Sequence, residues 1–136
     1  MAEPFLARLK MDDDLLEAIA KEFERRSIRK GAFSVIGAVR KTVLGYYDSD
    51  KRQYFNRDFD FHSEIVSCQG NVSEKDGEIF VHAHLIIAGT DFQCYGGHLM
   101  PGTPIFLAEL HGTPIPGEVP KRVFDDPTGL FAWEWK

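Results

Sequence analysis

The sequence predicts an α+β fold, in which a mainly antiparallel β-sheet carries one main helix on its face. One observation behind this is a helical period of apolar side chains over residues 15–23. The other is that turns rich in Gly, Asp and Ser divide most of the remaining chain into short apolar or alternating segments, a pattern typical of strands. At 136 residues, the chain is expected to form a single domain over residues 1–136.

The first two expected elements are a strand and the helix. Residues 5–10 alternate loosely between apolar and polar side chains, which predicts a strand. Three aspartates at positions 12–14 follow, and they can cap a helix and interact favourably with its positive end. The apolar period then begins at Leu15 and predicts a helix that ends near Arg26.

Three further strands are expected before residue 58, over residues 32–39, 41–48 and 53–57. The first of them is apolar and rich in small residues, which indicates a buried strand. The second is expected to lie beside the first. A turn at residues 49–51 joins the second to the third.

A hairpin is expected at residues 74–77, because an Asp-Gly pair forms a favourable tip for a two-residue turn. It follows an apolar segment at residues 59–67. It leads into the longest expected strand, residues 78–88, and residues 94–100 are expected to pair back on that strand.

The C-terminal part is expected to contain one more core strand, over residues 105–111. Residues 112–120 hold too many prolines for the interior of a sheet. In the tail, Trp133, Glu134 and Trp135 alternate as in a strand, with both indoles on one face.

The charge and the apolar content of the chain argue against nucleic acid and membrane as partners. The net charge is −5, whereas nucleic-acid binding draws most of its affinity from Lys and Arg. Acidic residues interrupt the densest group of basic residues, so this group is interpreted as a solvated helix face. Its members are Lys21, Arg25, Arg26, Arg29, Lys30, Arg40 and Lys41. The chain has no apolar run of about 18 residues, so no membrane span is expected.

The cysteines and the N-terminus favour a cytoplasmic protein. Cys68 and Cys94 form neither a CxxC pair nor a disulfide framework, and both are expected to be small buried residues. Residues 1–5 lack the basic and then apolar pattern of a secretory signal. A reducing cytoplasm is therefore the expected location.

Three of the five histidines lie within residues 82–98, and they form the strongest chemical signal in the chain. His82 and His84 are two residues apart in an apolar run, so on a strand both imidazoles lie on one face. A turn centred on Asp91 places His98 directly opposite His84, on that same face. Three neutral imidazoles that converge on one point are typical of a site for a divalent transition metal.

Such a site leaves the fourth position of the metal open. A closed structural zinc site normally has a fourth protein ligand, and no cysteine lies at a matching spacing. Gly96 and Gly97, just before His98, permit the close approach of a ligand or of a neighbouring backbone. The two remaining histidines, His62 and His111, are isolated and are interpreted as having no ligand role.

An ordered set of short motifs spans nearly the whole chain. It comprises residues 5–10 with the helix after them, the glycine-bounded segment 31–38, EIVSCQGNV at 64–72, HAHL at 82–85 and GGHL at 96–99. This set resembles the PPC (plant and prokaryote conserved) domain family, whose Glu-Ile-Leu-Ser-x-x-Gly signature is similar to residues 64–72. The last two segments resemble the His-x-His and Gly-Gly-His-Leu motifs of its stand-alone prokaryotic members.

The resemblance implies an α+β fold that assembles as a homotrimer. A trimer would also account for the 11 phenylalanines, because obligate interfaces resemble protein cores. The resemblance further implies that His82, His84 and His98 hold a divalent metal, expected to be zinc. Plant members carry Arg-Gly-Arg-Pro hooks that read the minor groove of DNA, and this chain contains none, which argues against direct DNA binding.

Three functions remain open from the sequence. The first is a metal-containing binding or regulatory module for a protein or nucleic-acid partner, indicated by the small size and by the absence of a nucleophile–base motif. The second is a metal-dependent enzyme, a hydrolase or lyase acting on a small molecule, with Glu64 or Glu109 as general base. The third is direct DNA binding by the domain alone, against which the acidic charge argues.

Overall fold

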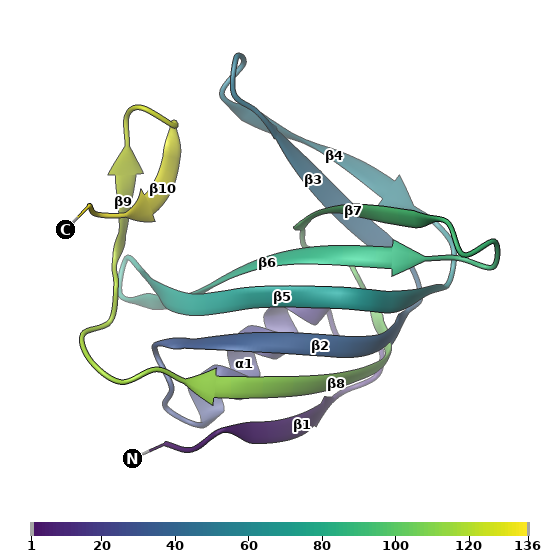
Figure 1. The fold of residues 1–136 in the computed structure, drawn as a ribbon, viewed down its shortest axis with the longest axis horizontal. Helices are drawn as coiled ribbons and strands as arrows, with labels where there is room; N and C mark the ends of the chain where they lie inside the picture. Colours follow the sequence, from purple (N-terminus) through teal and green to yellow (C-terminus); the bar gives the residue numbers. More distant parts are fainter. Residues whose placement is uncertain (1, 136) are drawn as a thin grey trace.

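The computed structural model describes residues 2–135, which form one large sheet, one helix and a separate two-stranded ribbon (Figure 1). In chain order the elements are β1 (Phe5–Leu9), α1 (Leu15–Arg25), β2 (Gly31–Val39), β3 (Thr42–Asp48), β4 (Gln53–Phe59), β5 (Ser63–Lys75), β6 (Glu78–Ala88), β7 (Cys94–Leu99), β8 (Ile105–Pro114), β9 (Arg122–Asp125) and β10 (Leu130–Trp133). The large sheet has eight strands in the order β1-β8-β2-β5-β6-β7-β3-β4, and its neighbouring strands are antiparallel. The predicted α+β class is confirmed.

Helix α1 begins where the aspartates predict. Asp14 is the N-cap residue, and its Oδ2 accepts a hydrogen bond from the N–H of Glu17 at 3.2 Å. This bond satisfies one of the N–H groups that have no partner within the helix. Within residues 2–135, no helix has the length and apolar character that crossing a bilayer requires.

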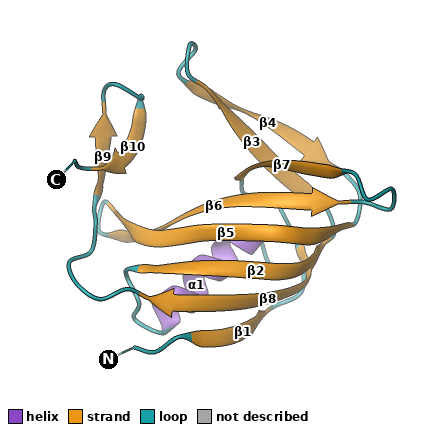
Figure 2. Cartoon of the chain, in the orientation of Figure 1, coloured by secondary structure: helices purple, strands orange, loops and turns teal. Residues whose placement is uncertain are grey.

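The apolar side of α1 packs against one face of the sheet (Figure 2). Ile19 and Phe23 are fully buried there. The ring of Phe23 lies 5.4 Å from that of Phe5 on β1 and 6.0 Å from that of Phe33 on β2. The helix and the central strands therefore share one aromatic and aliphatic core, in which each buried large side chain stabilises the fold by about 1.5–3 kcal/mol.

The face of the sheet opposite α1 presents both polar and apolar side chains. Direct strand pairing forms one row across it, from Leu6 through His111, Ser34, Gln69 and His84 to His98. Ile36 and Ile86 lie two residues from this row and so share its face. Leu6 is 81% exposed, Ile36 59% and Ile86 41%. We call this surface the open face.

The expected pairing of residues 41–48 with residues 32–39 is wrong. Strand β2 pairs with β5 and β8, whereas β3 pairs with β4 and β7. The reason lies in the link between β2 and β3, which is Arg40 and Lys41. A two-residue hairpin of the favoured types requires a positive φ in the link, and neither residue has one.

Strand β8 is longer than predicted and continues through Pro114. The N–H of Ile115 donates to the carbonyl oxygen of Lys30, towards β2. The nitrogen of Pro114, one residue earlier, therefore points to the other side, towards β1. There it meets no strand partner, since β1 begins opposite Gly112. The proline thus removes no bond of the sheet ladder.

The predicted strand over Trp133, Glu134 and Trp135 is wrong beyond its first residue. Strand β10 ends at Trp133, which pairs with Arg122, the first residue of the short strand β9. Glu134 and Trp135 lie outside any strand, and Trp135 is 97% exposed.

Candidate metal centre

The hairpin of β6 and β7 has the register that the sequence predicts. His84 pairs directly with His98, and the loop over residues 89–93 lies at the end of the hairpin. His82 is two residues before His84 on β6 and lies opposite Asn71 of β5. All three imidazoles therefore lie on the open face.

The three imidazoles converge. The ring centroids of His82 and His84 are 5.1 Å apart, those of His82 and His98 are 5.1 Å apart, and those of His84 and His98 are 5.7 Å apart. One nitrogen from each ring lies within 4.8 Å of the others. Nitrogens bound to zinc at about 2.0–2.1 Å are separated by about 3.4 Å in a tetrahedral site, so small side-chain rotations bring these atoms to that geometry.

Glycines let the neighbouring strands approach the cluster closely. A Cβ atom at Gly97 would lie 3.0 Å from the carbonyl oxygen of Gly45 on β3, and one at Gly96 would lie 3.3 Å from Cγ1 of Ile86. Gly45 in turn pairs with His98. Of the two expected alternatives, Gly96 and Gly97 allow the close approach of neighbouring strands, β6 and β3.

Burial keeps two of the imidazoles neutral. The pKa of His98 is lowered to about 4, first by burial and then by the nearby charges of His82, His84 and Arg122. Burial is also the main reason why the pKa of His82 is lowered, followed by Arg122 and His84. Both rings are therefore neutral at pH 7, and each has a nitrogen lone pair for a metal ion.

The donor set fits a divalent transition metal. Neutral imidazole nitrogens suit zinc, copper, iron and nickel, whereas calcium and magnesium prefer oxygen ligands. Among residues 2–135, the cluster of His82, His84 and His98 is the one group of potential ligands with converging atoms. A metal bound here would have three protein ligands, and its fourth position would be open, as in catalytic sites.

Comparison with known proteins places the chain in a family. Residues 1–111 match the Plants and Prokaryotes Conserved (PCC) domain. The chain belongs to this family. The resemblance to PPC domains that the motifs indicate is thereby confirmed. No curated protein matches the chain.

Solved structures of similar proteins share the fold over almost the whole chain. A metal-containing protein from Archaeoglobus fulgidus is 41% identical, with a TM-score of 0.93 over 98% of this chain and 94% of its own. A plant- and prokaryote-conserved protein from Pyrococcus horikoshii is 30% identical, with a TM-score of 0.94 over 99% of this chain and 93% of its own. A protein from Bacteroides thetaiotaomicron, 19% identical, has the same fold, with a TM-score of 0.89 over 98% of this chain and 93% of its own.

The other candidate residues lie away from the centre of this PCC domain. Glu64 pairs with Ala88, the last residue of β6. Ala88 is four residues after His84, which corresponds to about 13 Å along the strand at about 3.3 Å per residue. Glu109 lies on β8, separated from β6 by β2 and β5. The structure therefore brings neither candidate base to the imidazoles.

The remaining histidines and the cysteines do not join the cluster either. The ring of His62 packs against that of Phe106, at 5.0 Å, and His111 lies on β8. Cys68 is buried as expected, and burial raises the pKa of its thiol to about 12. Cys94 is exposed, so the prediction of burial is wrong for this residue, which is the first of the short strand β7.

Most of the basic group forms ion pairs on and around the helix. Lys21 pairs with Glu17, Arg25 and Arg26 with Glu22, Arg29 with Glu74, and Arg40 with Asp12. These pairs neutralise the positive charges locally. The interpretation of this group as a solvated helix face agrees with this arrangement.

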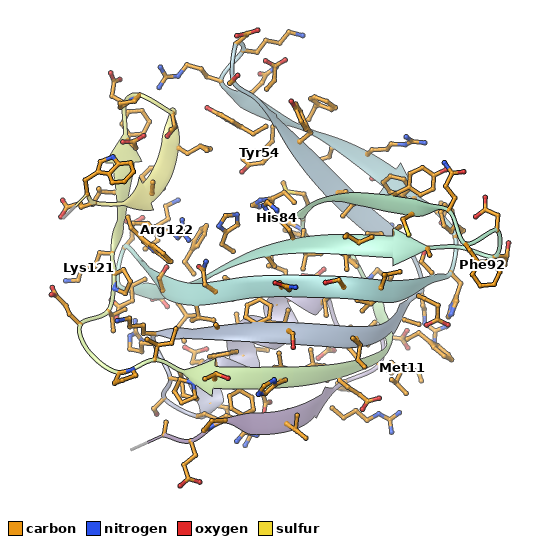
Figure 3. All side chains as sticks on the ribbon, viewed as in Figure 1. Met11, Tyr54, His84, Phe92, Lys121 and Arg122 are labelled. Atoms are coloured by element: carbon orange, nitrogen blue, oxygen red, sulfur yellow. The ribbon has the colours of Figure 1, made fainter. Side chains whose placement is uncertain are left out.

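Sequence reasoning missed two side chains that border the metal centre. The ring of Tyr54 on β4 lies 4.9 Å from that of His98 on β7. In the sheet, β3 lies between these two strands. Arg122 on β9 donates from Nη2 to Oδ1 of Asn71, the residue opposite His82, at 3.2 Å. Figure 3 shows Tyr54, His84 and Arg122 around the same region of the molecule. Neither residue belongs to a motif, so no local signal marks it.

Two arms frame the centre and touch at their tips. One is the β3–β4 hairpin and the other is the β9–β10 ribbon (Figure 1). The hydroxyl of Tyr47 donates to the carbonyl oxygen of Thr128 at 2.5 Å, and Nη2 of Arg52 donates to that of Asp126 at 2.5 Å. Both contacts are exposed to solvent.

Proposed function

We propose that this PCC-domain protein is a homotrimeric binding module in which His82, His84 and His98 hold a divalent metal, expected to be zinc. The observation that carries the proposal is the convergence of one nitrogen from each of the three rings within 4.8 Å. The relative described as a metal-containing protein, 41% identical to this chain, supports it.

The environment of the centre supports reversible binding of a ligand to the metal. A divalent ion held by three neutral imidazoles keeps an open position, at which it acts as a Lewis acid towards an incoming ligand. His82 and His84 line a surface hollow of about 550 Å³, together with residues that include Gln69, Asn71 and Ile86. A molecule of modest size can reach the ion through this hollow.

The position of the carboxylates favours a binding module over an enzyme. A general base must lie within hydrogen-bond reach of the proton that it removes. Glu64 and Glu109 lie on distant parts of the sheet. Direct DNA binding has less support, because the basic group around the helix is paired with carboxylates.

The open face supports self-association. It exposes Leu6 on β1 and Ile36 on β2, neither of which lines the hollow beside the imidazoles, and α1 covers the other face of the sheet. Apolar surface of this kind is typical of an interface between subunits. The two free cysteines agree with a reducing compartment, for which we propose the cytoplasm.

Metal analysis of the untagged protein tests the proposal. We expect about one divalent ion per chain, and at least a tenfold loss of zinc affinity in equilibrium dialysis for His84→Ala. His84 is exposed, so this variant leaves the core intact. His62→Ala, a histidine outside the cluster, should bind zinc as the parent protein does. Equal zinc binding by all three proteins would refute the site.

Light scattering after size-exclusion chromatography tests the trimer. The parent protein should have the mass of three chains. Ile36→Asp, which places a charge on the open face, should give monomers, whereas Met11→Asp, on the loop before α1, should remain trimeric. A monomeric parent protein would end this part of the proposal.

A further inference from the structure

Arg122 is a partly buried cation held in place by neutral groups. Its Nε donates to Oγ of Ser73, its Nη1 to the carbonyl oxygen of Phe131 and its Nη2 to Oδ1 of Asn71, each at 3.2 Å. Ser73 is fully buried, which fixes one of these acceptors in the core of the sheet. A guanidinium has five N–H donors, so two remain for a further acceptor.

Aromatic rings fix the orientation of this guanidinium. Its Cζ lies 4.7 Å from the ring centroid of Phe80 and 5.1 Å from that of Trp133. The indole N–H of Trp133 also donates to Oγ of Ser73, at 3.1 Å. Arg122 is therefore positioned before any ligand arrives, which lowers the entropic cost of binding one.

Among residues 2–135, the charge of Arg122 has no counterion. None of the ion pairs among residues 2–135 includes it, whereas Arg25, Arg29 and Arg40 each pair with a carboxylate. Burial lowers the pKa of Arg122, and the group that opposes this effect is Tyr54, a neutral phenol at pH 7. A desolvated cation of this kind favours a bound anion.

Arg122 also lies close to the imidazoles. Its Asn71 partner is the residue opposite His82, and its charge contributes to the lowered pKa of both His82 and His98. Figure 3 shows Arg122 on the side of His84 towards the β9–β10 ribbon, and Tyr54 on the side towards the β3–β4 hairpin. With a divalent ion on three neutral ligands, the centre and Arg122 would together carry three positive charges.

We propose that the open position of the metal and the guanidinium of Arg122 together bind one oxyanion group, the carboxylate or phosphate of a small molecule. One oxygen binds the metal, and another accepts hydrogen bonds from the two remaining N–H groups of Arg122. This inference rests on the proposed metal site and names the class of its ligand. Arg122 lies beyond residues 1–111, which match the PCC domain, so the family match does not itself assign this role.

A spectroscopic titration of the cobalt(II)-loaded protein tests the inference. The visible spectrum of cobalt changes when an anion enters its coordination shell, so it reports binding without any activity. Inorganic phosphate and acetate serve as separate probes at constant ionic strength. We expect at least one of them to change the spectrum in a saturable way, and the probe that binds more tightly identifies the source of the oxyanion.

Three variants give the titration its controls. Arg122→Gln should bind the anion at least tenfold more weakly, as expected for loss of a charge-assisted hydrogen bond. Arg122→Lys should recover only part of this loss, because it restores the charge without the planar fork. Arg57→Gln, which removes an arginine stacked on Phe59 and Tyr95, should bind as the parent protein does.

The outcomes separate this inference from the proposed function. If cobalt fails to bind the parent protein, the metal site itself is refuted. If cobalt binds with one ion per chain in both the parent and Arg122→Gln, the variant is folded. Identical anion affinities in those two proteins, or the lack of a saturable change with either probe, would then overturn the oxyanion site alone.

Discussion

Removal of one imidazole should abolish the thermal stabilisation that a metal gives to this protein. An ion that binds only the folded chain stabilises it by about 2.7 kcal/mol at a free concentration of about 100 times its Kd. For 136 residues, the unfolding entropy near the midpoint is about 290 cal/mol/K. Zinc at that concentration should therefore raise the melting temperature by about 9 °C.

The His84→Ala variant should lose most of this increase. If the loss of one of three ligands weakens binding about 100-fold, the same zinc concentration only equals the Kd of the variant, which corresponds to about 0.4 kcal/mol or about 1.5 °C. The apo variant should melt within about 2 °C of the apo parent, because His84 is exposed.

Differential scanning calorimetry at pH 7.5, with and without zinc, gives both numbers. His62→Ala, whose ring packs on Phe106 outside the cluster, should keep the full increase of about 9 °C. An increase in His84→Ala equal to that of the parent would refute the assignment of the three ligands. So would a parent protein whose melting temperature does not respond to zinc or to a chelator.

Three further predictions concern the fold that holds the site. The apo protein should lose stability in urea as the pH falls from about 6.5 to about 4. In this range the unfolded chain binds a proton at His98, whereas the folded chain, in which the pKa of His98 is lowered, does not. His98→Asn should reduce this pH dependence, and the part that remains comes from His82, whose pKa is also lowered. Phe23→Ala should lower the free energy of unfolding by about 3–5 kcal/mol, whereas Phe92→Ala, at a side chain 86% exposed, should change it by less than about 0.5 kcal/mol. In urea titrations, Gly77→Ala should lower the free energy of unfolding by about 1–2 kcal/mol, because φ is +79° but the new Cβ has no atom within 4 Å. Gly37→Ala should lower it more, because its Cβ would lie 2.0 Å from the carbonyl oxygen of Leu107. Equal losses would contradict this steric reasoning.

The parts of the site that lie within one hairpin could be predicted from the sequence. The i, i+2 spacing of His82 and His84 determines their common face, and a turn near Asp91 determines that His98 pairs with His84. These are local properties of the chain.

The parts that depend on long-range pairing could not be predicted. Strand β2 pairs with β5 and β8, and the two residues after it do not adopt the positive φ of a tight hairpin turn. Arg122 reaches the centre only because the chain returns after β8 and places β9 beside β5. Its partners Asn71 and Ser73 are about 50 residues earlier, and no local pattern relates residues at that separation.

The contact between the two arm tips sets the width of the opening between the arms. Two solvent-exposed hydrogen bonds, each worth about 1 kcal/mol, hold the β3–β4 hairpin against the β9–β10 turn. Parting them leaves both two-stranded arms intact, since their own ladders join β3 to β4 and β9 to β10. Separation of the two tips would therefore widen the opening between the arms without breaking any strand pairing.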